Sequence, residues 1–165
     1  MSEFSITSPD FNDGEEIPKI FGYKQHEYEH ESPHIRFKSV PNEAKTLALI
    51  MDDPDAMAAV GKVWVHWLLA NISPQAEILR GETPLRILAE DDEEDGLEMI
   101  KGKTDFGEIG YGGPAPPDKR HTYIFKAYAL DIVLNLKEGY SKQELEDAMK
   151  DHILAEAKLT GTFAP

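Results

Sequence analysis

Apolar residues along this chain occur in short runs, and each run is followed by residues that are typical of turns. Lys45–Met51 (KTLALIM) ends at Asp-Asp-Pro-Asp, and Lys62–Ile72 (KVWVHWLLANI) is rich in β-forming residues and ends at Ser-Pro. A third run, His121–Ile132, alternates aromatic and small residues. Runs of this length with such endings favour buried strands over helices. The pattern therefore predicts three core strands, and Lys158–Phe163 is expected to form a final short one.

Strict alternation along Lys62–Ile72 divides its side chains between two faces. One face would hold Trp64, His66, Leu68, Ala70 and Ile72, and the other Val63, Val65, Trp67 and Leu69. Both sets are largely apolar. We therefore expect a central strand that is covered on both sides.

One segment has the signals of a helix. Ser141 and Glu144 fit the capping box, in which the serine accepts from a backbone N–H and the glutamate reaches back. The residues that follow at helical spacing are Leu145, Ala148, Met149, His152 and Ile153. Gly107–Pro117 is too rich in glycine and proline for regular structure. These elements predict one mainly β domain over residues 1–165, either a sandwich or a pair of antiparallel sheets.

Composition narrows the possible partners. The 31 acidic residues against 17 basic ones give a formal net charge of −14, which repels nucleic acids and anionic membranes. The chain has no cysteine, which excludes disulfides and a thiol nucleophile. No apolar run approaches the ~20 residues that span a bilayer, and the first residues lack a signal-peptide pattern. We expect a cytoplasmic protein that inserts into no membrane.

Polar side chains interrupt the apolar runs at three places. Asp53-Pro54-Asp55 follows a strand, and the proline fixes the backbone between two carboxylates. His66 lies within an apolar strand, and the glycine–proline segment leads directly into His121 with Tyr123 on the same strand face. Each feature alone is typical of a turn, a buried structural histidine or an architectural loop. Their combination in one small domain favours a binding site.

Longer motifs occur in a fixed order around these positions. They are DPDA (53–56), WVHW (64–67), TDFGEIGYGGPAPP (104–117) and HTYIFKAYALD (121–131), flanked by SPDFNDGEEIP (8–18) and SPHI (32–35). With these motifs nearly the whole chain resembles the phosphatidylethanolamine-binding protein family, in its shorter bacterial and archaeal form.

The resemblance implies a large central antiparallel sheet packed on a smaller sheet, with one or a few short helices. It also implies a pocket for phosphate, acetate or a phospholipid head group, without a metal ion or cofactor. The pocket residues would be Asp53, Asp55, His66, His121 and Tyr123, together with the backbone of Gly112, Gly113 and Pro114. Relatives have been linked to inhibition of kinases and proteases, and prokaryotic ones are often dimers, so that a protein target and a homodimer are further expectations.

The chain departs from the family's usual motifs at three places. Met57 stands where the family usually has proline, and Thr122 where it usually has arginine after the histidine. Lys24–Glu31, dense in His and Glu, replaces the family's usual loop sequence and is expected to be exposed. The arginine's absence changes the charge expected at the rim of the pocket.

Two arrangements allow carboxylates beside a phosphate, although like charges repel. In the first, each aspartate bonds a histidine and favours the imidazolium, which then attracts the anion. In the second, the ligand carries a proton or an amine that a carboxylate accepts. The N–H groups of Gly112 and Gly113 would add neutral donors in either case.

Two other functions compete with a binding protein. A hydrolase acting on a small phosphoester or ester would use Asp and His as general acid and base, but the three pocket motifs contain no cysteine or serine nucleophile. We therefore expect no enzymatic activity. His26, His30 and His34 recur every four residues and could ligate zinc from a helix. Pro33 interrupts such a helix, so that a solvated loop is the favoured interpretation.

Overall fold

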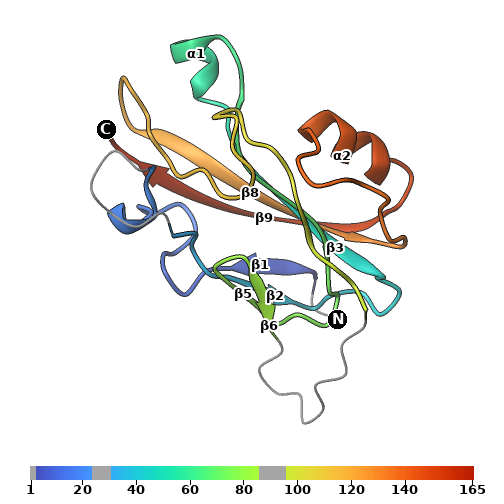
Figure 1. The fold of residues 1–165 in the computed structure, drawn as a ribbon. Coiled ribbons are helices and arrows are strands. Elements are labelled where there is room, and N and C mark those ends of the chain that lie inside the picture. Colours follow the sequence, from blue (N-terminus) through green and yellow to red (C-terminus); the bar gives the residue numbers. More distant parts are fainter. Residues whose placement is uncertain (1–2, 24–30, 86–95) are drawn as a thin grey trace.

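Two antiparallel sheets and one covering helix organise the protein, seen here in a computed structural model that describes residues 3–23, 31–85 and 96–165 (Figure 1). The larger sheet has five strands in the spatial order β7-β4-β3-β8-β9. Its strands are β3 (Thr46–Asp53), β4 (Trp64–Ile72), β7 (Ile100–Lys101), β8 (His121–Leu130) and β9 (Ile153–Phe163).

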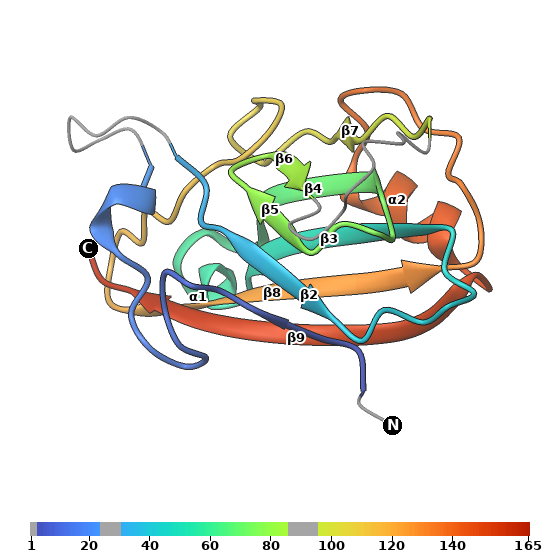
Figure 2. The ribbon, with the colours of Figure 1, turned by 90° about the horizontal axis from the view of Figure 1, so that it is seen from below.

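The smaller sheet has four short strands in the order β1-β2-β5-β6. They are β1 (Ser5–Thr7), β2 (Ile35–Lys38), β5 (Ile78–Arg80) and β6 (Thr83–Leu85). Seen from below, these short strands lie across the long strands of the larger sheet (Figure 2). The helical elements are the 3-10 turn η1 (Lys19–Phe21), α1 (Ala56–Val60) and α2 (Lys142–Met149).

Each face of the larger sheet has its own apolar core. Leu49, Met51 and Phe125 point toward the smaller sheet and pack with its Ile35 and Leu79. On the opposite face Ile50, Leu68 and Leu130 pack beneath α2, whose buried residues are Leu145 and Met149. Burial on both faces is the property expected of the long apolar strands, and it confirms the central position predicted for the strand that contains His66.

The predicted elements are largely confirmed, with differences at their ends. The capping box at Ser141 and Glu144 is present, but α2 ends at Met149 instead of continuing through Ile153. Asp151 adopts a left-handed backbone with φ of 68°, which a helix does not tolerate, and Ile153 begins β9. The last strand is therefore much longer than the predicted Lys158–Phe163. Five short strands, η1 and α1 were not predicted.

A β-bulge in β4 overturns the predicted division of its faces. Met51 pairs with Trp67 and Asp52 pairs with Val65, so that His66 is the extra residue of the longer strand. A second irregularity follows near Asn71, between the pairs of Leu47 and Leu49. Trp67 and Ile72 consequently lie on the side of the smaller sheet, whereas Val65, Leu68 and Ala70 lie on the side of α2.

Some expectations fall outside the residues that the structure describes. These include His26, His30 and most of the Lys24–Glu31 segment. Within the described residues, no helix is long and apolar enough to cross a bilayer.

Candidate functional site

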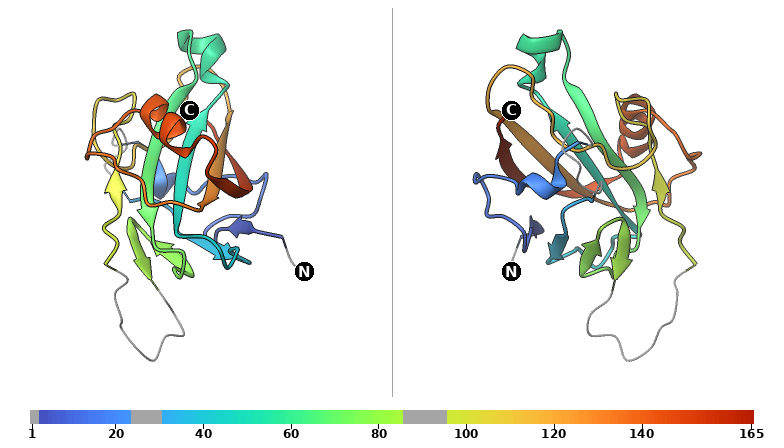
Figure 3. Two further views of the ribbon diagram at one scale, coloured as in Figure 1. Left: turned by 90° about the vertical axis from the view of Figure 1, so that its right-hand side faces the viewer. Right: turned by 60° about the vertical axis from the view of Figure 1, so that its left-hand side comes forward.

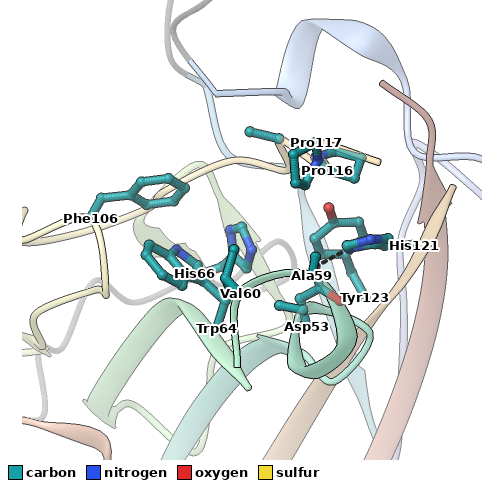
Figure 4. Close-up of a pocket in the computed structure, with 12 residues that line it drawn as sticks. Asp53, Ala59, Val60, Trp64, His66, Phe106, Pro116, Pro117, His121 and Tyr123 are labelled. Carbon is teal, nitrogen blue, oxygen red and sulfur yellow. Dashed lines mark hydrogen bonds and ion pairs between the residues drawn. The ribbon is translucent and has the colours of Figure 1, made fainter. Parts of the chain in front are cut away.

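A cavity lies beside the short helix α1, where β3 ends and where β4 and β8 begin. This helix stands at the end of the molecule away from the smaller sheet (Figure 3). The volume of the cavity is about 120 Å³, which is room for a small molecule, since a single water needs only about 10–15 Å³. The residues around it come from five segments of the chain (Figure 4). They are Asp53, Ala56, Ala59, Val60, Trp64, His66, Phe106, Ala115, Pro116, Pro117, His121 and Tyr123.

The Asp53-Pro54-Asp55 turn directs its two carboxylates to different partners. Asp53 is 3% exposed and ends β3, and one of its oxygens accepts from the backbone N–H of Asp55 at 3.0 Å. Asp55 is the N-cap residue that precedes α1, and its carboxylate accepts from the backbone N–H of Thr122 at 2.8 Å. Only Asp53 lines the cavity. Asp55 instead ties the turn to the start of β8.

His121 lies between two carboxylates. Its Nδ1 is 2.6 Å from Asp53 Oδ2, and its Nε2 is 2.6 Å from Asp118 Oδ1. Burial acts to lower the pKa of His121, but the hydrogen bonds and charges of Asp53 and Asp118 outweigh burial and hold this pKa above its usual value. Carboxylate oxygens accept hydrogen bonds, so that this geometry places a proton on each ring nitrogen and makes His121 an imidazolium.

The pKa of each carboxyl beside His121 also departs from its usual value. Burial raises the pKa of Asp53, and the hydrogen bond from His121 offsets part of that rise. For Asp118 desolvation acts upward, but the hydrogen bond and charge of His121 and the backbone hydrogen bonds together outweigh it, and the pKa lies below its usual range. Of the two pairs of pocket aspartate and histidine considered from the sequence, one is therefore present, that of Asp53 with His121.

His66 has a different partner and a different charge. Its Nδ1 is 2.6 Å from the carbonyl oxygen of Gly112, to which it donates, and the N–H of Gly112 donates back to the His66 carbonyl at 2.7 Å. Burial lowers the pKa of His66 to about 4, despite the hydrogen bond to Gly112. The expectation of a second imidazolium at His66 is therefore wrong. The side chain is neutral, and its Nε2 is an acceptor.

The glycine–proline loop serves mainly to hold the wall of the cavity. The N–H of Gly112 is taken by His66, which contradicts the prediction that it is a donor for a ligand. A Cβ on Gly113 would lie 2.3 Å from the carbonyl oxygen of Phe21, so that only glycine allows this approach. Pro114 accepts from the N–H of Tyr23 at 3.0 Å. The loop residues that do line the cavity are Ala115, Pro116 and Pro117.

Aromatic rings form one wall of the cavity. The ring centroid of Phe106 lies 5.5 Å from that of His66 and 5.5 Å from that of Trp64, and both contacts are edge-on. Tyr23 stacks on Phe106 with a centroid distance of 4.0 Å. In Figure 4 the Tyr123 hydroxyl points toward Pro116, close to His121. Burial raises the pKa of Tyr123 far above its usual value, so that this hydroxyl keeps its proton.

Two buried donors at this cavity have no hydrogen-bond partner among the described residues. They are Nε1 of Trp64 and the hydroxyl of Tyr123, which lies near the Asp53 carboxylate and the backbone of Ala115 but in hydrogen-bond geometry with neither. A buried polar group without a partner costs roughly 1–3 kcal/mol, and native structures contain few of them. Both donors belong to residues that line the cavity.

The sequence prediction thus identified four residues that meet at the cavity, namely Asp53, His66, His121 and Tyr123. It missed Trp64, Phe106 and the contact of Asp118 with His121. Asp118 had a weak signal, since it lies three residues before His121. Among the described residues no group of three or more His, Cys, Asp or Glu has the geometry of a metal site. His34 lies 4.0 Å from Asp10, at the surface.

Comparison with known proteins gives consistent matches. Residues 7–164 match the sequence model of a family described as phosphatidylethanolamine-binding protein. A UPF0098 protein of Methanothermobacter thermautotrophicus is 42% identical over 153 residues, which cover 93% of each chain. The crystal structure of a phosphatidylethanolamine-binding protein homologue from Chlamydia trachomatis superposes with a TM-score of 0.83 at 37% identity, covering 99% of this chain and 98% of the other. E. coli YbcL, described as a member of the mammalian family, superposes with a TM-score of 0.82 at 27% identity over 98% of both chains.

Proposed function

The chain belongs to the phosphatidylethanolamine-binding protein family, and from that premise we propose that it is a binding protein whose cavity holds a small oxyanion. The ligand would be phosphate, acetate or the phosphate of a phospholipid head group. The observation that carries this proposal is the pair of buried donors, Trp64 Nε1 and the Tyr123 hydroxyl, without partners at one cavity. Oxyanion oxygens are acceptors and would satisfy both donors.

The charges around the cavity favour a monoanion. The His121 imidazolium supplies positive charge to a site that also contains the Asp53 carboxylate. A dianion would be repelled by Asp53, whereas a singly charged oxyanion is repelled less. His66 offers Nε2 as an acceptor, because its Nδ1 donates to Gly112. A protonated phosphate oxygen can donate to that nitrogen, which combines the two arrangements considered from the sequence.

The apolar part of the wall adds a second contact for a larger ligand. Ala59 and Val60 of α1 line the cavity opposite Phe106 and Pro116, and Val60 is 51% exposed. A phosphate that carries an organic group, such as a phospholipid head group, would place that group against these side chains. Free phosphate would use only the polar end of the cavity.

Replacing Tyr123 by phenylalanine tests this proposal. The phosphate affinity is expected to fall about 10–100-fold, because one hydrogen bond to a charged group contributes roughly 1.5–3 kcal/mol. The free energy of unfolding is expected to stay the same or rise, because the buried hydroxyl has no protein partner to lose. Calorimetric titration with phosphate and denaturant unfolding would measure the two quantities.

Tyr140→Phe is the matched control. The Tyr140 hydroxyl donates to the carbonyl of Ile100 at 2.8 Å, outside the cavity. Its loss should lower the free energy of unfolding by about 1 kcal/mol and leave phosphate affinity unchanged. If Tyr123→Phe behaves like this control, the hydroxyl is structural and the proposal loses its main support.

A hydrolase remains the competing function, with less support at this site. His121 donates from both ring nitrogens, and an imidazolium has no lone pair with which to accept a proton from a nucleophile. Turnover of a chromogenic phosphoester that disappears on changing Asp53 would favour the hydrolase over the binding protein.

A further inference from the structure

His121 has no nitrogen left for a ligand in this structure. An imidazole ring has two nitrogens, and each lies 2.6 Å from a carboxylate oxygen, one of Asp53 and one of Asp118. The His121 side chain is also 0% exposed. An anion that approaches this imidazolium can therefore form a direct hydrogen bond only by taking the place of one of the two carboxylates.

The two carboxylates differ in how firmly they are held. Asp53 ends a central strand, its side chain is 4% exposed, and its second oxygen accepts from the N–H of Asp55. Asp118 lies in the loop before β8, and its side chain is 40% exposed. Ion pairs with an exposed partner contribute little to stability, because water solvates the released group. Asp118 is thus the carboxylate that can leave.

The position of Asp118 next to the cavity makes such an exchange possible without a change of backbone. Pro116 and Pro117 directly precede it and line the cavity, and proline restricts their backbone angles. Arg120, two residues later, donates to Thr162 of β9 at 3.1 Å and lies 3.7 Å from Glu16. With the chain held on both sides, rotation of the Asp118 side chain into water is sufficient to free Nε2.

We propose that Asp118 occupies the oxyanion position on Nε2 of His121 and that a ligand carboxylate or phosphate binds there by replacing it. The inference rests on the proposed function, because it names the subsite that the oxyanion would use. Asp118 then acts as an internal competitor and sets the affinity and the charge preference of the site. Apparent affinity is reduced by the fraction of molecules in which Asp118 covers the imidazolium.

The test compares phosphate binding by the wild-type protein with binding by Asp118→Asn and Asp118→Ala. Removing the competitor is expected to raise phosphate affinity about 3–10-fold in both variants. The titrations are made at about pH 6, below the ordinary histidine pKa of about 6.5, so that His121 stays charged without Asp118. Glu16→Gln is the matched control, because it removes one negative charge beside Arg120 without touching His121, and its affinity should stay within about twofold of wild type.

The possible outcomes distinguish the exchange, in which a ligand replaces Asp118 on His121, from the proposed binding function. If wild type binds phosphate, Tyr123→Phe weakens binding, and neither Asp118 variant binds more tightly than Glu16→Gln, the exchange is wrong and the binding function stands. If the Asp118 variants bind more weakly, Asp118 supports the site instead of competing for it, and the exchange is again wrong. If none of the proteins binds phosphate or acetate at millimolar concentration, both proposals fail.

Discussion

Replacing His121 by glutamine is expected to weaken oxyanion binding by at least tenfold. Glutamine has no charge, so that the anion would face the buried Asp53 carboxylate without the imidazolium that now lies 2.6 Å from it. Hydrogen bonds to charged groups contribute roughly 1.5–3 kcal/mol, and about 1.4 kcal/mol corresponds to a tenfold change in affinity. Calorimetric titration with acetate measures the effect. Acetate is suitable because carboxylic acids titrate near pH 4 and keep one charge above about pH 6.

The wild-type protein should bind acetate most tightly at pH values where His121 is charged. Asp53 and Asp118 hold the pKa of His121 above its usual 6.5, so that binding persists above that pH and is lost as the pH rises through the raised pKa. The double variant Asp53→Asn/His121→Gln controls for folding, because it leaves no buried carboxylate without its imidazolium, and the remaining Asp118 is half-exposed. This double variant should show cooperative unfolding, as a folded protein does, and should not bind acetate. Wild-type-like binding by His121→Gln would show that the imidazolium is not the anion contact.

His66 should make the protein lose stability in mild acid. Its pKa is lowered from 6.5 to about 4 in the folded protein because the ring is buried. Below pH 6.5 the unfolded chain therefore takes up a proton that the folded protein refuses until about pH 4. Each pH unit in this window removes up to about 1.4 kcal/mol, and the full window removes about 3 kcal/mol from the free energy of unfolding. Stability is thus highest above pH 6.5 and falls as the pH falls.

The variant His66→Gln should remove this part of the pH dependence. Glutamine can still donate to the carbonyl of Gly112 but does not titrate. Urea unfolding of both proteins between pH 7 and 4 gives the difference in slope that belongs to His66, since carboxylates contribute equally to the two curves. Parallel curves for wild type and His66→Gln would mean that His66 is protonated in the folded protein.

The long elements of the fold could be predicted because their signals are local. Runs such as Lys45–Met51 are too apolar for anything but a buried strand, and the Ser141 cap has a defined spacing. The bulge at His66 could not be predicted, because the packing of Met51, Trp67 and Val65 across two cores decides it. The pattern that predicted a helix through Ile153 fails for a similar reason: the pairing of Ile153 with Leu130 in the sheet replaces the helical contact.

The site could be predicted in part because its polar residues interrupt apolar strands. Asp53, His66 and His121 stand out in that way, and the structure places all three at one cavity. Their charges could not be predicted, since they depend on partners from other segments. Burial keeps His66 neutral although its Nδ1 donates to the carbonyl of Gly112, and Asp118 shares His121 with Asp53. Asp55 is as prominent in the sequence as Asp53, yet it bonds the backbone of Thr122 outside the cavity.

The two tryptophans offer the most direct test of oxyanion binding at this cavity. The chain has two of them, hence two indole N–H signals in a proton–nitrogen correlation spectrum. Nε1 of Trp67 already donates to Glu82 at 3.1 Å, whereas Nε1 of Trp64 has no partner among the described residues. Trp64→Phe assigns the signals, and sodium chloride at matched ionic strength controls for salt. On titration with phosphate, the Trp64 signal should move downfield and saturate with the calorimetric affinity, while the Trp67 signal stays in place. A stationary Trp64 signal, or equal movement of both, would contradict oxyanion binding at this cavity.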